Sequence, residues 1–450
     1  MTGVDRARPP APGALRPFDF PAFTRERLAT GLEIVLAPRS EVPLVEILLQ
    51  LPAGGDRNPL DRPGLSALTA SLIDEGTARR SGPEIAAAIE RLGGDLATRA
   101  DWNSADLEVG LLARDVDAGL ELVAELARDP VFPDDEVERL RRQAMAELLR
   151  RRDQPAVLAE EALSSALYAG TPYGALILGD ESAMSAIGRD EIRAFHAGFY
   201  RAAGASLVIV GDFDASAVRG RIETIFGDWR TEPPAAAPEI TPVATRGRRV
   251  VIVDRPAGAQ TELRVVQPGV PRTHPDRTRL GLLNALLGGK FTSRLNLNLR
   301  ERHGYTYGVN SRFVDRRGPG PFVISTAVAN PVTGAAVREV LSELERMRDE
   351  AVTPEELEET RSYILGVFPY TLQTTSAILS RLAELALWGF TDDHYDRALD
   401  EIRATSAEQV LDLARRHLAP ERATIVAVGP AEALAPQLEG FGEIEVRRVD

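Results

Sequence analysis

The chain has 450 residues, of which 44% are hydrophobic and 27% are charged. This composition is typical of globular domains and does not indicate a disordered chain, and the length predicts about two or three domains. The formal net charge of −14 argues against a general binder of nucleic acid or anionic membranes, which needs an excess of Lys and Arg. The absence of cysteine excludes disulfides and thiolate metal sites.

The first 17 residues are rich in Pro, Arg and Ala and predict an extension ahead of the first domain. They contain no apolar run typical of a secretory signal. No stretch of the chain approaches the roughly 18 consecutive apolar residues of a membrane span. We therefore expect a cytoplasmic protein, with a periplasmic location as the alternative if synthesis starts upstream of Met1.

Residues 231–247 are rich in Pro and Ala and predict an extended linker between domains at 18–230 and 248–450. Each domain opens with two strand-like runs and closes with a helix, a buried strand and a glycine. These matched runs are 32–36, 44–51, 190–200 and 206–211 in the first domain, and 249–253, 261–266, 407–417 and 423–429 in the second. The shared order predicts a duplicated α+β unit.

Two further patterns lie inside the first domain. The segment from Ser104 to Ala113 alternates as a strand with one buried face does. The segment from Val137 to Arg152 repeats apolar residues on one helical face, which places Glu147 beside an apolar stripe.

The most informative run is Leu299 to Val309, LRERHGYTYGV, which follows Leu287 to Leu295, LGGKFTSRL. Arg300 is expected at the end of a helix, and Tyr307, seven residues later, at the start of a strand. Two fixed donors of this kind can hold the carbonyl oxygens of an extended peptide. The ordinary alternative is a helix-capping Arg and a core Tyr. Tyr305 is expected on the same strand face as Tyr307, where it could share its role.

This run resembles the C-terminal-domain signature of the M16 (pitrilysin-like) zinc peptidases, in which an Arg and a Tyr at this spacing contact the substrate. The resemblance covers about residues 20 to 445. It implies an α+β fold of two homologous α/β-sandwich domains, of the M16 and LuxS-like metallohydrolase type, that form half of a clam-shell.

The segment from Gly64 to Thr77 resembles the M16 helix that carries an inverted zinc motif, His-x-x-Glu-His. Residues four apart share a helix face, so two imidazoles can bind one Zn²⁺ while the Glu activates its water. In this chain the two His positions fall on Ala67 and Ser71, and the Glu position falls on Ala70. The motif is therefore degenerate.

Glu147 matches the position of the family's third zinc ligand. We expect it to be a remnant, or a surface acid paired with Arg150 or Arg151. No two of the five histidines lie within a helical turn of each other in sequence, so only a cluster formed by folding could supply imidazole ligands. They are His196, His274, His303, His394 and His417.

In M16 members with split functions, one subunit supplies the zinc site and the other the Arg/Tyr pair. The resemblance therefore implies a non-catalytic, substrate-binding subunit that supplies Arg300 and Tyr307 to the zinc site of a partner carrying His-x-x-Glu-His. We expect no cofactor on this chain, zinc in the partner, a peptide substrate, and neither nucleic acid nor membrane. The first alternative is a catalytically silent structural or peptide-binding scaffold. The second alternative is a homodimeric peptidase with an unrecognised site.

Overall fold

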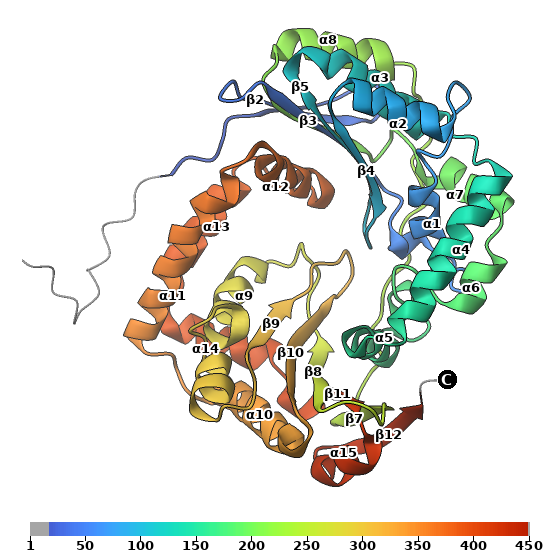
Figure 1. The fold of residues 1–450 in the computed structure, drawn as a ribbon. Coiled ribbons are helices and arrows are strands. Elements are labelled where there is room, and N and C mark those ends of the chain that lie inside the picture. Colours follow the sequence, from blue (N-terminus) through green and yellow to red (C-terminus); the bar gives the residue numbers. More distant parts are fainter. Residues whose placement is uncertain (1–17, 449–450) are drawn as a thin grey trace, which may run out of the picture.

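The computed structural model describes residues 18 to 448, so the predicted extension at 1–17 lies outside the described residues. Two six-stranded sheets, one in each half of the chain, organise a mixed α+β fold (Figure 1). This confirms the predicted fold class of two α/β units.

The first sheet consists of β1 (Thr24–Arg27), β2 (Glu33–Pro38), β3 (Leu44–Leu51), β4 (Asp95–Ala100), β5 (Ala105–Leu112) and β6 (Ser206–Gly211). The strands lie in the order β1-β2-β6-β3-β5-β4. β2 and β6 run parallel, and the other neighbours run antiparallel. β6 is buried along its whole length because both faces of its apolar run are covered.

The second sheet consists of β7 (Arg249–Asp254), β8 (Gln260–Pro268), β9 (Val309–Phe313), β10 (Pro321–Ala329), β11 (Thr424–Gly429) and β12 (Glu443–Arg448). Its order is β12-β7-β11-β8-β10-β9. The parallel pair β7 and β11 corresponds to β2 and β6, and β8, β10 and β9 follow as β3, β5 and β4 do. Only the outer strand differs, because β12 runs parallel to β7 whereas β1 runs antiparallel to β2.

The helices follow the strands in nearly the same order in both halves. In the first half they are α1 (Leu65–Ser71), α2 (Gly82–Arg91), α3 (Val116–Arg128), α4 (Asp134–Arg151), α5 (Pro155–Tyr168), α6 (Glu181–Ala186), α7 (Arg189–Phe199) and α8 (Ala215–Phe226). In the second they are α9 (Arg277–Asn284), α10 (Thr333–Asp349), α11 (Pro354–Val367), α12 (Thr375–Trp388), α13 (His394–Ala404), α14 (Ala407–His417) and α15 (Ala431–Leu438). Two π-helical turns, η4 (Ala285–Gly289) and η5 (Asn296–Arg302), lie between α9 and β9. None of the helices within residues 18–448 combines the length and apolarity needed to cross a bilayer.

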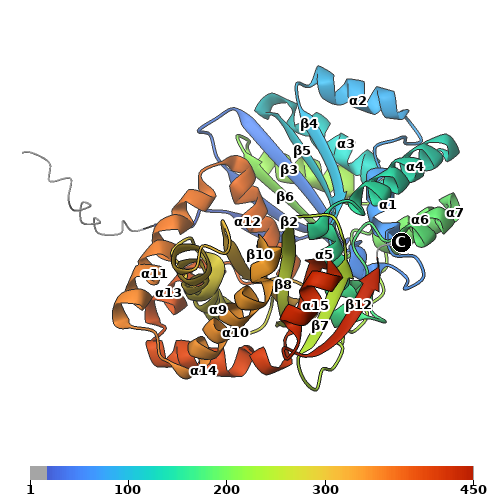
Figure 2. The same cartoon turned by 60° about the horizontal axis from the view of Figure 1, so that its bottom comes forward.

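Each half lends one helix to the sheet of the other half (Figures 1 and 2). α12 packs on β3 and β6 of the first sheet, where Leu379 and Leu382 meet Val208 and Val210. α5 packs on β8 and β11 of the second sheet, with Ala159 against Val426. α5 and α12 hold equivalent places in the chain order, since each is the third helix after its half's second hairpin strand. The exchange therefore ties the two halves together through buried apolar surface.

Polar contacts reinforce this junction. The Arg317 Nε atom lies 3.0 Å from Oδ2 of the buried Asp56. The Arg316 guanidinium lies 4.5 Å from the ring centre of Trp102, and burial lowers the pKa of Arg316 to about 10. Burying a charge without such partners would destabilise the folded state by several kcal/mol, on the order of the desolvation penalty of one ion. The contacts therefore fix how the two halves sit against each other.

The predicted linker, residues 231–247, contains neither helix nor strand. It is nevertheless docked, because Ile240 packs beside Trp102 and Tyr168 and the Val243 N–H donates to the carbonyl oxygen of Leu167 at 2.7 Å. The domain boundaries at 230 and 248 stay a prediction, since α5 and α12 cross between the halves.

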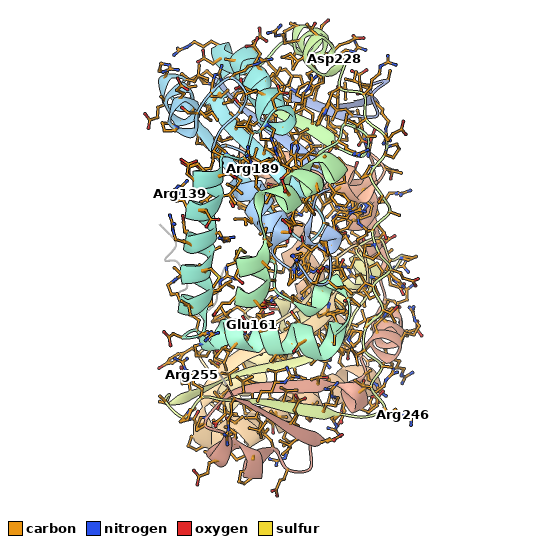
Figure 3. All side chains as sticks on the ribbon, turned by 90° about the vertical axis from the view of Figure 1, so that its right-hand side faces the viewer. Arg139, Glu161, Arg189, Asp228, Arg246 and Arg255 are labelled. Carbon is orange, nitrogen blue, oxygen red and sulfur yellow. The ribbon has the colours of Figure 1, made fainter. Side chains whose placement is uncertain are left out.

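α4 lies along the flank of the first half, where Figure 3 labels Arg139 on it. Arg139 reaches Glu75 at 2.6 Å and Glu136 at 2.5 Å. The pair with Glu75 holds α4 beside the segment that follows α1, the pair with Glu136 lies within α4, and α4 carries Glu147.

Candidate functional site

α1 occupies the place of the expected zinc-binding helix. Its first turn starts at Gly64, whose φ of 96° is a left-handed conformation that favours glycine. Ala70 is 2% exposed and faces the core, while Ala67 is half-buried. The Ser71 hydroxyl donates to the carbonyl oxygen of Leu68 at 2.9 Å. The three motif positions thus offer neither an imidazole nor a carboxylate.

Folding does bring Ser71 and Glu147 to the same cavity, of about 570 Å³. Glu147 Oε2 accepts hydrogen bonds from Arg150 at 2.6 and 2.9 Å, and Oε1 accepts one from Arg151 at 3.0 Å. The bonds from Arg151 and Arg150 lower the pKa of Glu147. Both expected ion pairs are therefore present.

This donor set does not fit a zinc ion. A catalytic zinc takes three protein ligands, usually imidazoles and carboxylates, and leaves one position for water. The described residues that line the cavity supply one carboxylate already bound by two guanidinium groups, the Ser71 hydroxyl and the Gln143 amide, and no imidazole.

Arg300 lies on η5, so its helix is a π-helical turn rather than a regular α-helix. Its guanidinium carbon lies 4.1 Å from the ring centre of Phe291, and its Nη1 atom lies 3.5 Å from Glu301 Oε1. Nη1 is buried without a hydrogen-bond partner among residues 18–448. A buried donor without a hydrogen bond is costly, so Arg300 holds a donor that a ligand oxygen would satisfy.

Two asparagines explain why η5 holds its wide turn. Asn296 Nδ2 donates to the carbonyl oxygen of Val309 at 2.8 Å, and Asn296 Oδ1 accepts from the Val309 N–H at 3.1 Å. Asn298 Nδ2 donates to Glu343 Oε1 at 2.7 Å. These bonds fasten η5 to β9 and α10. Single π-turns are frequent at functional sites because they reposition side chains.

Tyr307 lies in the loop before β9 rather than at the start of a strand, since β9 begins at Val309. Its side chain is 94% exposed. The loop itself is held: the Gly308 N–H donates to Thr306 Oγ1 at 3.1 Å, and Thr326 Oγ1 donates to Thr306 Oγ1 at 2.9 Å. A large aromatic residue is thus presented to solvent by an ordered backbone.

The expectation that Tyr305 and Tyr307 share a strand face is wrong, because neither residue lies in a strand. Tyr305 packs against the core of the second half and stacks on His303 with ring centres 4.9 Å apart. The glycine between the two predicted site residues, Gly304, has a φ of 63° and reverses the chain there.

Arg300 and Tyr307 therefore flank one turn of the chain, and no interaction joins their side chains within the described residues. Phe291 was missed by the sequence analysis. It is 67% exposed and covers one face of the Arg300 guanidinium. An exposed aromatic two residues after a Gly-Gly pair carries no specific sequence signal, so only the fold reveals this contact.

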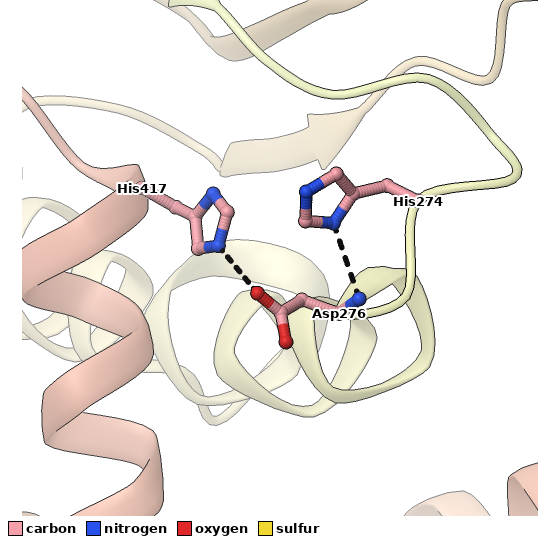
Figure 4. Close-up of side chains that lie close together, drawn as sticks. All are labelled: His274, Asp276 and His417. Carbon is pink, nitrogen blue, oxygen red and sulfur yellow. Dashed lines mark hydrogen bonds and ion pairs between the residues drawn. The ribbon is translucent and has the colours of Figure 1, made fainter.

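A second polar cluster joins residues far apart in sequence (Figure 4). His417 Nε2 lies 2.9 Å from Asp276 Oδ2, and His274 Nδ1 accepts the Asp276 N–H at 3.1 Å. Arg416 Nη1 reaches the same Asp276 oxygen at 2.5 Å. Partial burial pushes the pKa of Asp276 upward, but the bonds from His417 and Arg416 outweigh it and lower that pKa. Folding thus forms the kind of histidine cluster that sequence spacing does not reveal.

Two family models match this chain. The insulinase (peptidase family M16) model matches residues 34–181, and the peptidase M16 inactive domain model matches residues 186–364. The two matches together span most of the chain, and the fold has the two sheets of M16 two-domain structures. The chain belongs to the M16 peptidase family.

Several relatives have a similar length. An uncharacterized zinc protease, YmxG of Bacillus subtilis, is 24% identical over 391 residues, which cover 86% of this chain and 93% of that protein. A non-peptidase homolog, YmxG of Helicobacter pylori, is 22% identical over 385 residues, covering 84% and 87%. The crystal structure of a peptidase M16 inactive domain from Pseudomonas fluorescens superposes with a TM-score of 0.84 and 26% identity, covering 91% of this chain and 98% of that one.

Proposed function

We propose that this chain is the non-catalytic, substrate-binding subunit of a heteromeric M16 zinc peptidase. In this proposal two such clam-shell halves assemble, and a partner with an intact His-x-x-Glu-His motif supplies the zinc. Arg300 and Tyr307 donate hydrogen bonds to the peptide backbone, or to the oxyanion that develops next to the partner's metal. Such donors act most strongly in a closed, water-poor site.

One contrast carries this proposal. The first half lacks the two zinc ligands at Ala67 and Ser71 and the general base at Ala70, while the second half keeps Arg300 with a buried donor that makes no hydrogen bond and Tyr307 on an ordered loop. A scaffold has no need for either feature. The non-peptidase homolog of Helicobacter pylori supports the view that a chain of this kind can lack activity of its own.

The test measures peptidase activity of the purified chain alone, of each M16 subunit from the same genome that carries the intact motif, and of their mixtures. A quenched fluorogenic peptide library serves as substrate. We expect activity only in one mixture, with association of the two chains in size-exclusion chromatography.

Other outcomes assign the chain differently. Association without any change in rate would support the structural or peptide-binding scaffold instead. Activity of this chain alone, abolished by a chelator, would contradict both ideas and support a homodimeric peptidase.

A further inference from the structure

We propose that His274, Asp276 and His417 form a binding site for a divalent metal ion of the zinc type. This site lies outside the M16 zinc motif and is independent of the proposed substrate-binding role. The sequence predicts no metal on this chain, both from the lost motif on α1 and from the spacing of the five histidines, and the proposed site departs from that expectation.

The donor set and its spacing carry the proposal. One ligand atom from each of the three residues lies within 4.8 Å of the other two. Zinc bonds of about 2.0–2.2 Å place neighbouring ligand atoms roughly 3.5 Å apart, so modest side-chain rotations close the site. Two imidazoles and one carboxylate, with a position left for water, suit Zn²⁺ and the related ions Co²⁺ and Ni²⁺.

Both imidazoles face Asp276, one from the end of α14 and one from the loop before α9 (Figure 4). The His274 and His417 rings meet edge to face with centres 5.4 Å apart. Since His274 Nδ1 already accepts the Asp276 N–H, its Nε2 is the nitrogen left for an ion. At His417 the ion would take the place of the proton that Nε2 shares with Asp276.

Hydrogen bonds fix the backbone on the α14 side of the cluster before any ion binds. The buried Gln267 of β8 donates from Nε2 to the His417 carbonyl oxygen at 2.6 Å and accepts the Ala419 N–H at 2.7 Å. These bonds fix the end of α14, and such support around the ligands is what gives metal sites their geometry.

The loop on the α9 side is fixed as well. Arg272 is bound by Glu384 of α12 at 2.5 Å, and Arg277 is bound by Asp315 at 2.7 Å. The His274 N–H donates to the carbonyl oxygen of Pro271 at 3.0 Å. Neither ligand segment therefore needs to refold to bind an ion.

An ion also has a route to the cluster. His417 lines a cavity of about 320 Å³, and His274 lines another of about 410 Å³. The side chains of His417 and Asp276 remain 12% and 13% exposed. An entry path is one of the requirements of a credible metal site.

Arg416 is the group that competes with a metal. Its guanidinium neutralises Asp276 through the same oxygen that His417 reaches. A divalent ion would replace this guanidinium as the cation facing the carboxylate. Since Arg416 is largely exposed, its displacement costs little, on the order of a surface ion pair.

The test uses the full chain without an affinity tag, stripped with a chelator and titrated with Co²⁺, then competed with Zn²⁺. We expect one Co²⁺ per chain with the visible absorption of a low-coordinate nitrogen and oxygen site, displaced by Zn²⁺. His274→Ala and His417→Ala should each weaken binding by more than about ten-fold, the smallest loss typical of damage around a metal site. Arg416→Gln should tighten binding, and Zn²⁺ should raise the unfolding temperature of the parent chain.

His394→Ala is the matched control, because His394 stacks on Phe390 outside the cluster and its loss should leave Co²⁺ binding unchanged. Asp276→Asn, which keeps the side-chain volume, tests the third ligand if either histidine variant is poorly folded without metal. Absence of saturable Co²⁺ uptake by the parent chain would overturn the proposal. Equal uptake by the parent, His274→Ala and His417→Ala would overturn it as well.

Discussion

The two halves of this molecule share one plan, yet they carry different chemistry at the same place in it. In both halves the chain leaves the fourth strand in the order of its sheet (β3 or β8) and enters a helix that leads toward the outer hairpin. In the first half this helix is the short, regular α1, which lacks zinc ligands. In the second half it is α9, prolonged by the π-turn η4, and the separate π-turn η5 that follows carries Arg300.

The first half shows that an M16 domain can keep its fold without its zinc site. The core of the first half remains complete, and α1 still contributes buried Leu65, Leu68 and Ala70 to it. Loss of the metal ligands therefore costs the fold little, because Ala70 packs within this core while Ala67 and Ser71 are only partly buried. In the second half, by contrast, the irregular backbone around Arg300 is held by specific bonds from Asn296 and Asn298.

A substitution on an exchanged helix should have the largest effect on stability. Leu382 of α12 is fully buried against the first sheet, so Leu382→Ala should lower the free energy of unfolding by about 2–5 kcal/mol through lost burial and a residual cavity. α12 belongs to the second half but packs on the sheet of the first, so it couples the two halves. Both halves should therefore still unfold in one transition in the variant. Urea unfolding followed by tryptophan fluorescence measures this.

Leu149→Ala on α4 is the matched control, since Leu149 is 52% exposed and should lose no more than about 0.5 kcal/mol. Equal losses for the two variants would contradict the exchange. A separate early transition of the first half would show that α12 is not an integral part of its core.

Arg300→Ala should have the next largest effect, on the mixture of this chain with its motif-bearing partner. Removal of one donor to a developing oxyanion costs about 10²–10³ in rate, so kcat/KM should fall by about 100-fold or more while association is retained. Arg302→Ala, an exposed arginine two residues further along the chain, should leave the rate unchanged. An undiminished rate for Arg300→Ala would refute the substrate-contact role.

The two halves also differ in the histidine near the end of the helix before their central strand. His196 on α7 is partly buried, and this burial lowers its pKa from 6.5 to about 4. The native state then binds fewer protons than the unfolded state, so the contribution of neutral His196 is complete above pH 6.5 and is lost as the pH falls toward 4. The loss amounts to at most about 3 kcal/mol.

His196→Gln tests this difference, because glutamine keeps an N–H that can donate to the Ala127 carbonyl oxygen, now 3.0 Å from His196 Nε2. The free energy of unfolding is measured from pH 7 to pH 4 for both proteins. The parent chain should lose more stability than the variant over this range. Parallel pH profiles would show that His196 does not titrate as proposed.

Much of the fold follows from local pattern. The runs 44–51 and 206–211 are β3 and β6, and 407–417 is α14, because apolar periodicity reports directly on burial. The exchange of α5 and α12 does not follow, since an apolar helix face indicates that a helix packs but not on which sheet. The π-turn at Arg300 depends on tertiary bonds from Asn296, and periodicity carries no trace of them.

The candidate sites also differ in whether the sequence alone can predict them. The degenerate positions Ala67, Ala70 and Ser71 are visible from the sequence because a zinc motif is a local pattern on one helix. His274 and His417 come together only because α14 packs beside α9, and no spacing rule links residues so far apart. Tyr305 was placed wrongly because the strand begins only at Val309, after both tyrosines.

Tyr307→Phe gives the smallest and most specific effect. It removes one hydroxyl while the exposed ring stays in place, so kcat/KM of the mixture should fall by about ten-fold, the value of one neutral hydrogen bond. If the hydroxyl acts only when charge develops on the substrate, the loss should lie in kcat with KM nearly unchanged. Tyr363→Phe on α11, which alters another exposed tyrosine, should have no effect. A rise in KM alone would instead assign Tyr307 to ground-state peptide binding, and Arg300 would then be the only residue of the second half acting on the transition state.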